Sequence, residues 1–372
     1  MALLSNLQNA SPLLLAASVS LLSAWLMLLT QRWHGHLSLD SHEGVQKFHT
    51  QATPRIGGLP VLIGLLAAWP LMPQKAQELM TYLLLAAIPA FGSGFVEDLT
   101  KKVSIHIRLL CTTGSGALAC VLTGYSVQHS GVWGLDWLLG FGVISVIFTA
   151  LAIGTMVNGI NMIDGFNGLS AGSVVIMLAG LAWIAQSTGD SDLAVLALAT
   201  AGAVFGFALI NWPWGKIFLG DGGAYLCGFA TAWIGVLLIE RNASVSTWAP
   251  LMVCAYPLLE VFFSILRRRH RKRHPGHPDR LHLHSLIHRR VSSFWLPALG
   301  PLGLNSITGA LMWPISLICC AWAVAFAGST PMLIVGVAGI AALYTLIYCR
   351  LVQFKWGIKR RTRELAAQSV GS

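Results

Sequence analysis

The feature that most constrains this chain is a series of long segments with almost no charge. Eleven such segments occupy residues 11–30, 56–72, 79–96, 109–125, 137–157, 169–186, 193–210, 224–239, 248–266, 306–327 and 331–349. A helix needs roughly 20 mainly apolar residues to cross about 30 Å of hydrocarbon. The sequence therefore predicts an all-α bundle of eleven transmembrane helices, forming a single integral-membrane domain over residues 1–372.

The composition excludes an ordinary soluble protein, since 55% of the residues are hydrophobic and only 10% are charged. The alternation of a membrane β-barrel is missing from these segments. A transporter or channel is the alternative class, but it would place charged residues along a path through the bundle. Only Glu260 lies inside a segment, near its basic end, and we expect it to pair with Arg267 or Arg268.

Lysine and arginine predict the orientation, because cytoplasmic loops carry the excess of positive charge. With eleven spans the two termini face opposite sides. A cytoplasmic C-terminus leaves only Lys75 and Arg241 outside, so 22 of the 24 Lys and Arg residues (24 minus 2) are cytoplasmic. The basic tail at 350–372 and the net charge of +10 suit anionic lipid headgroups at the bilayer surface, and we expect no nucleic-acid partner.

One polar stretch, NGINMIDGFNGLSAG at residues 158–172, directly follows an uncharged segment. Asn158 and Asn161 share a face if the helix continues, and Asp164 follows about one turn later. The stretch must lie at a membrane surface, because an unpaired amide or carboxylate costs about 2 kcal/mol or more in lipid. A solvated turn also favours Asn, Asp and Gly, so this pattern alone leaves a turn and a site as alternatives.

NGINMIDGFNGL resembles the N-x-x-N-x-x-D-G-x-x-G-L motif of the polyprenyl-phosphate N-acetylhexosamine-1-phosphate transferases, which are of the glycosyltransferase family 4 type. Four further stretches resemble motifs of that family in the same order along the chain: GVQKFHTQATPRIGG, GFVEDLTKKVS, FLGDGGA and PDRLHLHS. The topology derived from charge alone puts all five on the cytoplasmic side. The agreement favours a cytoplasmic active site in a bacterial inner membrane.

The resemblance implies roles for individual residues. Catalytic roles fall on Glu97, Asp98, Lys101 and Asp164, and Asp221 and Asp98 are implied ligands of Mg²⁺, with Mn²⁺ as a substitute. Substrate binding is implied for eight residues: His49, Arg55, Asn158, Asn161, Asn211, Arg280, His282 and His284. From the charges we expect Asp98, Asp164 and Asp221 to converge on one metal-dependent centre.

The chain departs from the family's motifs at three positions that matter for the site. Glu97 replaces an Asp, Asn167 stands where many relatives carry a second Asp, and Ser285 replaces a His. Asp164 is therefore the only carboxylate in its loop.

The implied reaction is the transfer of an N-acetylhexosamine 1-phosphate from a UDP-sugar to undecaprenyl phosphate, which releases UMP and initiates O-antigen or other lipid-linked polysaccharide synthesis. We expect UDP-GlcNAc or a UDP-FucNAc-like donor. The phospho-MurNAc-pentapeptide transferase of peptidoglycan synthesis is the alternative within the family. A one-step and a phospho-enzyme mechanism stay open, and a homodimer is compatible with the sequence.

Overall fold

The computed structural model describes residues 2–40, 53–270 and 281–353. Two short strands, β1 (Leu39–Asp40) and β2 (Thr53–Pro54), pair antiparallel. The longer elements are helices: α1 (Ala2–Leu29), α2 (Gln31–Ser38), α3 (Gly58–Ala68), α4 (Gln74–Thr100), α5 (Ile105–Thr123), α6 (Trp133–Leu139), α7 (Gly142–Ile163), α8 (Leu169–Ser187), α9 (Ser191–Asn211), α10 (Gly220–Arg241), α11 (Trp248–Val253), α12 (Ala255–His270), α13 (Leu283–Ile287), α14 (Ser293–Trp295), α15 (Gly300–Ala325) and α16 (Thr330–Val352). The predicted all-α membrane architecture is confirmed. The tail beyond residue 353 lies outside the described residues.

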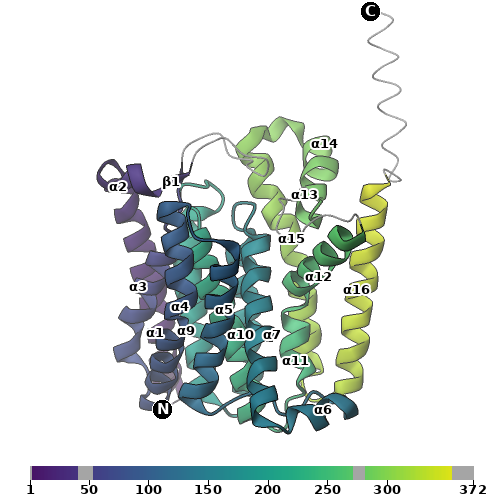
Figure 1. Ribbon diagram of the computed structural model, residues 1–372. Coiled ribbons are helices and arrows are strands. Elements are labelled where there is room, and N and C mark those ends of the chain that lie inside the picture. The colour runs from purple at the N-terminus through teal and green to yellow at the C-terminus, as the bar shows by residue number, and fades with distance from the viewer. Residues whose placement is uncertain (1, 41–52, 271–280, 354–372) are drawn as a thin grey trace, which may run out of the picture.

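Nine helices within the described ranges are long and apolar enough to cross a membrane: α1, α4, α5, α7, α8, α9, α10, α15 and α16. The other two predicted segments are the shorter α3 and the interrupted pair α11 and α12. The first helix begins and the last helix ends at opposite ends of the bundle (Figure 1). A helix is thus present at each predicted segment, and the number that cross the membrane stays a prediction.

Proline explains both irregular segments. Pro70 and Pro73 follow α3, and the extended backbone of Met72 between them ends the helical path before α4. Pro257 falls in the first turn of α12, where its missing N–H costs no helical hydrogen bond. The chain therefore changes direction at Cys254 and starts a new helix instead of continuing α11.

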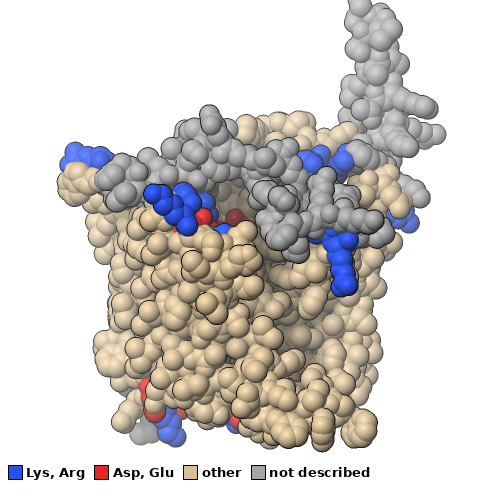
Figure 2. All heavy atoms as spheres, in the orientation of Figure 1, with Lys and Arg blue, Asp and Glu red and all other residues tan. Residues whose placement is uncertain are grey.

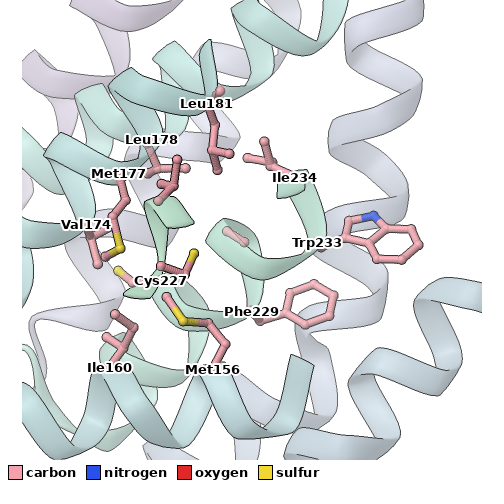
Figure 3. Packing of buried hydrophobic residues seen from close by; sticks show 14 of the residues in the cluster. Met156, Ile160, Val174, Met177, Leu178, Leu181, Cys227, Phe229, Trp233 and Ile234 are labelled. Carbon is pink, nitrogen blue, oxygen red and sulfur yellow. The ribbon is translucent and has the colours of Figure 1, made fainter. Parts of the chain in front are cut away.

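The centre of the bundle is α10, which is almost entirely buried among its neighbours. Figure 3 shows Cys227 of α10 beside Met156 of α7 and Met177 of α8, and Ile234 of α10 facing Leu181 of α8. Lipid tails are as apolar as these side chains, so close van der Waals packing replaces the hydrophobic driving force between helices. Gly228 permits it, because a Cβ there would lie 2.7 Å from the Cα of Val157 on α7.

Three helices touch backbone to backbone where α10 begins. A Cβ added at Gly58 of α3 would lie 2.5 Å from the backbone nitrogen of Gly223. One added at Gly94 of α4 would lie 2.6 Å from the carbonyl carbon of Asp221. Both approaches are shorter than real Cβ contacts allow, so glycine is needed on α3 and α4. These contacts hold the start of α10 against two other helices.

Charged side chains gather at the two ends of the bundle, with an uncharged band between them (Figure 2). The end where α4 finishes and α10 begins is hollowed, and acidic side chains lie inside the hollow below Lys and Arg side chains (Figures 1 and 2). The motif residues of the sequence analysis that the structure describes lie at this end.

Candidate active site

Asp98, near the C-terminal end of α4, binds the start of α10. Its side chain is only 2% exposed, and its two oxygens accept the backbone N–H groups of Asp221 and Gly222 at 2.9 Å each. The first N–H groups of a helix lack helical partners and carry its positive dipole, so a carboxylate is stabilised there. Gly220, with φ +75°, allows this approach: a Cβ would lie 2.5 Å from Asp98 Oδ2. The predicted metal ligand Asp98 therefore caps α10.

Asp221 stands in the first turn of α10 and collects donors from three other segments. Arg55 Nη2 and Asn161 Nδ2 each donate to its Oδ1 at 3.0 Å, and Arg108 of α5 donates to Oδ2. Arg55 also places its Nε 3.6 Å from Asp98 Oδ1. Two carboxylates and two guanidinium groups thus share one cluster with balanced charge.

Asp164, directly after α7, joins the same cluster. Burial raises its pKa to about 6, although the Ser170 hydroxyl donates to its Oδ1 and the charge of Arg55 favours ionisation; the nearby Asp221 raises the pKa further. Arg55 therefore interacts with all three acids. The structure brings Asp98, Asp164 and Asp221 together from three different segments.

Glu97 and Lys101 shape the turn after α4. Glu97 Oε2 accepts the backbone N–H of Val103 at 2.8 Å. Lys101 ends α4 in the left-handed conformation, φ 56°, and its Nζ donates to the backbone carbonyl of Asp98 at 2.8 Å. Both hydrogen bonds fix the backbone that carries Asp98. The predicted catalytic roles of these two residues stay predictions.

The predicted amides separate into different positions. Asn158 Nδ2 donates to the Gly154 carbonyl at 2.7 Å and lies 3.4 Å from Thr112 of α5, whereas Asn161 reaches Asp221. Asn211 is buried and uses its whole amide: it accepts from the Gly168 N–H at 2.6 Å and donates to the Ile217 carbonyl at 2.8 Å. Only Asn161 of the three touches the acidic cluster.

Asn167, the replacement for a second Asp, turns away from the acids. Its backbone N–H donates to Asn305 at 2.8 Å and its side chain donates to Ser306 at 3.2 Å, both on α15. An aspartate could not donate to Ser306 in this way. The substitution therefore joins the loop to α15.

The two described histidines of the last motif lie beside Glu260. His282 Nδ1 is 3.2 Å from Glu260 Oε2, and His284 Nδ1 is 3.8 Å from Oε1. Arg267, one expected partner of Glu260, donates to Tyr348 at 3.2 Å. The structure gives Glu260 two histidine neighbours, and its expected tie to Arg267 or Arg268 stays a prediction. His49 and Arg280 lie outside the described residues.

Sequence reasoning missed two residues of the cluster, Arg108 and Ser170. Arg108 belongs to no motif, and its only signal is its place among the cations predicted to be cytoplasmic. Ser170 lies six residues after Asp164, a spacing that becomes a contact only because the chain turns between α7 and α8.

The chemistry of the cluster suits a hard cation such as Mg²⁺, which prefers carboxylate and amide oxygens. Within residues 2–40, 53–270 and 281–353, no group of three or more His, Cys, Asp and Glu side chains is arranged to hold a metal ion. Arg55, Arg108 and Asn161 occupy the oxygens of Asp221, and backbone amides occupy those of Asp98. Arg55 and Arg108 are 27% and 20% exposed. The expected Mg²⁺ site therefore stays a prediction.

Comparison with known proteins supports the resemblance. Residues 80–239 match the family described as Glycosyl transferase family 4. Over this region the chain is similar to that family. The matched region begins on α4 and ends on α10. It contains Asp98, Asp164 and Asp221 and does not include Arg55, His282 or His284. The resemblance stated from the motifs is thereby confirmed.

Three bacterial relatives are similar to this chain over about two thirds or more of their length. A probable undecaprenyl-phosphate N-acetylglucosaminyl 1-phosphate transferase of Bacillus subtilis is 29% identical over 252 residues, which cover 68% of this chain and 69% of that protein. The undecaprenyl-phosphate alpha-N-acetylglucosaminyl 1-phosphate transferases of Yersinia pestis and Escherichia coli O157:H7 are 26% and 25% identical, over 68% and 74% of this chain and 70% and 77% of their own lengths.

Proposed function

We propose that this protein transfers N-acetylglucosamine 1-phosphate from UDP-GlcNAc to undecaprenyl phosphate. Its membrane-spanning fold gives access to a lipid acceptor, and the relatives named above carry this activity in their names. The observation that supports it best is the cluster of Asp98, Asp164 and Asp221 with Arg55 and Arg108, because such a cluster suits two phosphate groups that must meet. A UDP-FucNAc-like donor is the variant of the same proposal.

In the proposed reaction an oxygen of undecaprenyl phosphate attacks the β-phosphorus of the UDP-sugar. The bond between that phosphorus and the oxygen bridging to the α-phosphate breaks, and its electron pair leaves with UMP. The lipid then carries a diphospho-sugar. Bringing one anion to another makes charge neutralisation and alignment the main work of the enzyme.

The residues divide this work according to their positions. Arg55 and Arg108 can exchange the carboxylate of Asp221 for phosphate oxygens, since both are partly exposed. Asp98 holds the start of α10 in place through the N–H groups of Asp221 and Gly222. Bound Mg²⁺, or Mn²⁺ as a substitute, neutralises a diphosphate and would be held by Asp221 and Asp164. A homodimer remains compatible with this scheme.

The proposal places the acidic cluster at the cytoplasmic face of a bacterial inner membrane, with eleven crossings and the N-terminus outside. The opposite placement of the first and last helix ends supports an odd number of crossings (Figure 1). Single cysteines near Lys75 and Asp190 should react with an impermeant thiol reagent added outside intact cells, and one near Lys216 should be protected. The reverse pattern would contradict the orientation.

The direct test is an assay of the purified protein with undecaprenyl phosphate and a panel of UDP-sugars. We expect UMP release and a lipid diphospho-sugar with UDP-GlcNAc or UDP-FucNAc. The family relatives do not favour the peptidoglycan branch. Turnover of the muramoyl-pentapeptide donor alone would refute the proposed donor class.

A further inference from the structure

Glu260 of α12 is a fully buried carboxylate that the proposed reaction does not use. It is 0% exposed and lies next to α13. Its Oε1 accepts the backbone N–H of Leu283 at 3.0 Å, and its Oε2 receives His282 Nδ1 at 3.2 Å. A carboxylate withdrawn from water is costly unless it is hydrogen bonded. These contacts therefore hold residues 282–288, the histidine segment, on α12.

The segment that Glu260 holds also lies against the Asp164 loop. The ring of Phe166 lies edge-on to that of His284, with centroids 5.6 Å apart, and 5.0 Å from that of His288. His288 Nδ1 lies 3.1 Å from Thr308 on α15. The histidine segment therefore bridges α12, the Asp164 loop and α15.

His284 is the residue of this segment that lies beside Gly165. The residue is buried, its ring stacks on His282 with centroids 5.3 Å apart, and its Nδ1 makes no hydrogen bond. Its Nε2 points the other way, 3.4 Å from the position of a Cβ at Gly165, next to Asp164. The Nε2 edge of the imidazole thus lies beside the Asp164 loop, and the Nδ1 edge lies beside Glu260.

The charge state of His284 follows from its surroundings. Burial lowers its pKa to about 4, although the charge of Glu260 opposes this shift. In a neutral imidazole one nitrogen carries the proton and the other accepts. Glu260 Oε1 is 3.8 Å from Nδ1, and a carboxylate favours the proton on the nitrogen nearest to it. Nε2 is left as an acceptor.

We infer that Glu260 is a positioning residue. Through His282 and Leu283 it holds His284 Nε2 beside the loop that follows Asp164, where Nε2 accepts a hydrogen bond from the substrate. The inference rests on the proposed function, since it assigns His284 to a donor group of the substrate, a hydroxyl or amide N–H of the sugar, and not to the phosphates. It also gives the two histidines different tasks: His282 anchors and His284 contacts.

A double-mutant cycle tests whether Glu260 acts through His284. We expect Glu260→Gln and His284→Ala each to lower kcat/KM for UDP-GlcNAc on the order of 10- to 100-fold, the cost of misplacing a contact group. The double variant should be no slower than His284→Ala alone. Glu240→Gln, which removes a carboxylate at the other end of α10, is the matched control and should stay within about twofold, because surface changes remote from a site have little effect. Multiplicative losses in the double variant would overturn the inference.

A second readout does not depend on the substrate. In the purified full-length protein without ligand, hydrogen–deuterium exchange should be slow in the peptide that contains residues 281–288 and faster in Glu260→Gln. Unchanged exchange would overturn the positioning role. If no UDP-HexNAc is turned over by the unaltered protein, the proposed function fails, while this exchange result still decides whether Glu260 holds the segment.

Substitutions at His282 test the same contact if the Glu260→Gln variant does not fold. His282→Asn keeps an N–H donor near the position of Nδ1, and His282→Ala removes it. The Asn variant should retain the slow exchange of residues 281–288, whereas the Ala variant should lose it. Equal behaviour of the two variants would overturn the anchoring role of His282.

Discussion

The two ends of the bundle use carboxylates in opposite ways. At the end away from the cluster, Arg241 donates two hydrogen bonds to the carboxylate of Asp190, from Nε at 2.7 Å and from Nη2 at 2.8 Å. Burial opposes the ionisation of Asp190, but Arg241 lowers the pKa of Asp190 below 3.8. The Ser130 hydroxyl likewise lowers the pKa of Asp136. At the cluster, burial raises the pKa of Asp164 to about 6.

This difference separates carboxylates that stabilise the fold from carboxylates that the fold must tolerate. Asp190 and Arg241 form a local bidentate pair, and nothing in it remains available for a ligand. At the other end three acids share two arginines with amide and backbone donors, and under the proposed function phosphate and a cation would change this charge balance. Perturbed carboxylates in a hollow are typical of functional sites. Four substitutions test this contrast.

Asp221→Asn should have the largest effect on activity. It removes the charge that Arg55 and Arg108 share and an oxygen ligand for Mg²⁺, so we expect a loss of about 100-fold or more in turnover, as for other removed electrostatic groups. Formation of the lipid diphospho-sugar, titrated against Mg²⁺, measures it. Near-normal rates at low Mg²⁺ would show that Asp221 binds no metal ion and has only a structural role at the start of α10.

Asp98→Asn should have a mixed effect. An Asn side chain has one acceptor oxygen, so one of the two backbone N–H groups at the start of α10 loses its partner, at about 1–3 kcal/mol. We expect turnover to fall on the order of 10-fold and the thermal unfolding midpoint to fall as well. A loss of turnover with an unchanged midpoint would instead favour direct handling of the lipid phosphate by Asp98.

Asp190→Asn should affect stability alone. It leaves Arg241 without its charged partner, a cost of about 1–3 kcal/mol for hydrogen bonds to charged groups. Because the folded pKa of Asp190 is depressed, its contribution is present above pH 3.8 and is lost as the pH falls further. We expect a lower unfolding midpoint at pH 7 and normal kcat/KM. A large loss of activity would remove the contrast between the two ends.

Asp164→Asn should have the smallest effect on stability, with the opposite sign. The folded pKa of about 6 lies above the ordinary 3.8, so the folded state binds this proton more tightly. The stabilisation is full below pH 3.8 and is lost as the pH rises through about 6. In EDTA the variant should therefore unfold at a higher temperature than the unaltered protein at pH 7.5 and at nearly the same temperature near pH 3.5. A lower midpoint at pH 7.5 would contradict the burial cost.

The helices were predictable because apolar length is a local property of the sequence, and each predicted segment is helical. The interruption at Cys254 was not predicted, since the uncharged pattern runs through it and only Pro250 and Pro257 signal the change. Whether α3 spans the membrane depends on its neighbours and on lipid, which hydropathy alone does not describe.

Some of the residues that form the candidate active site could be predicted from the sequence. Asp164 and Asp221 stand in motifs, but the task of Asp98 depends on where α10 begins relative to α4, which is a tertiary property. Arg108 carries no motif and enters the cluster because α5 packs beside α4. The histidine neighbours of Glu260 were not predicted, because His282 lies 22 residues away in sequence and only the tertiary structure brings its Nδ1 within 3.2 Å of Glu260.

The backbone contacts of Gly58 and Gly94 with the start of α10 affect how a mutational scan of this protein would read. Any larger residue at either glycine would push α3 or α4 away from α10 and carry Arg55 or Asp98 with it. Both glycines should therefore tolerate replacement as poorly as Asp221, although neither has a side chain to offer a substrate. Intolerance alone would then outline a region larger than the catalytic residues, and chemical rescue or altered metal preference would be needed to tell the acids from their supports.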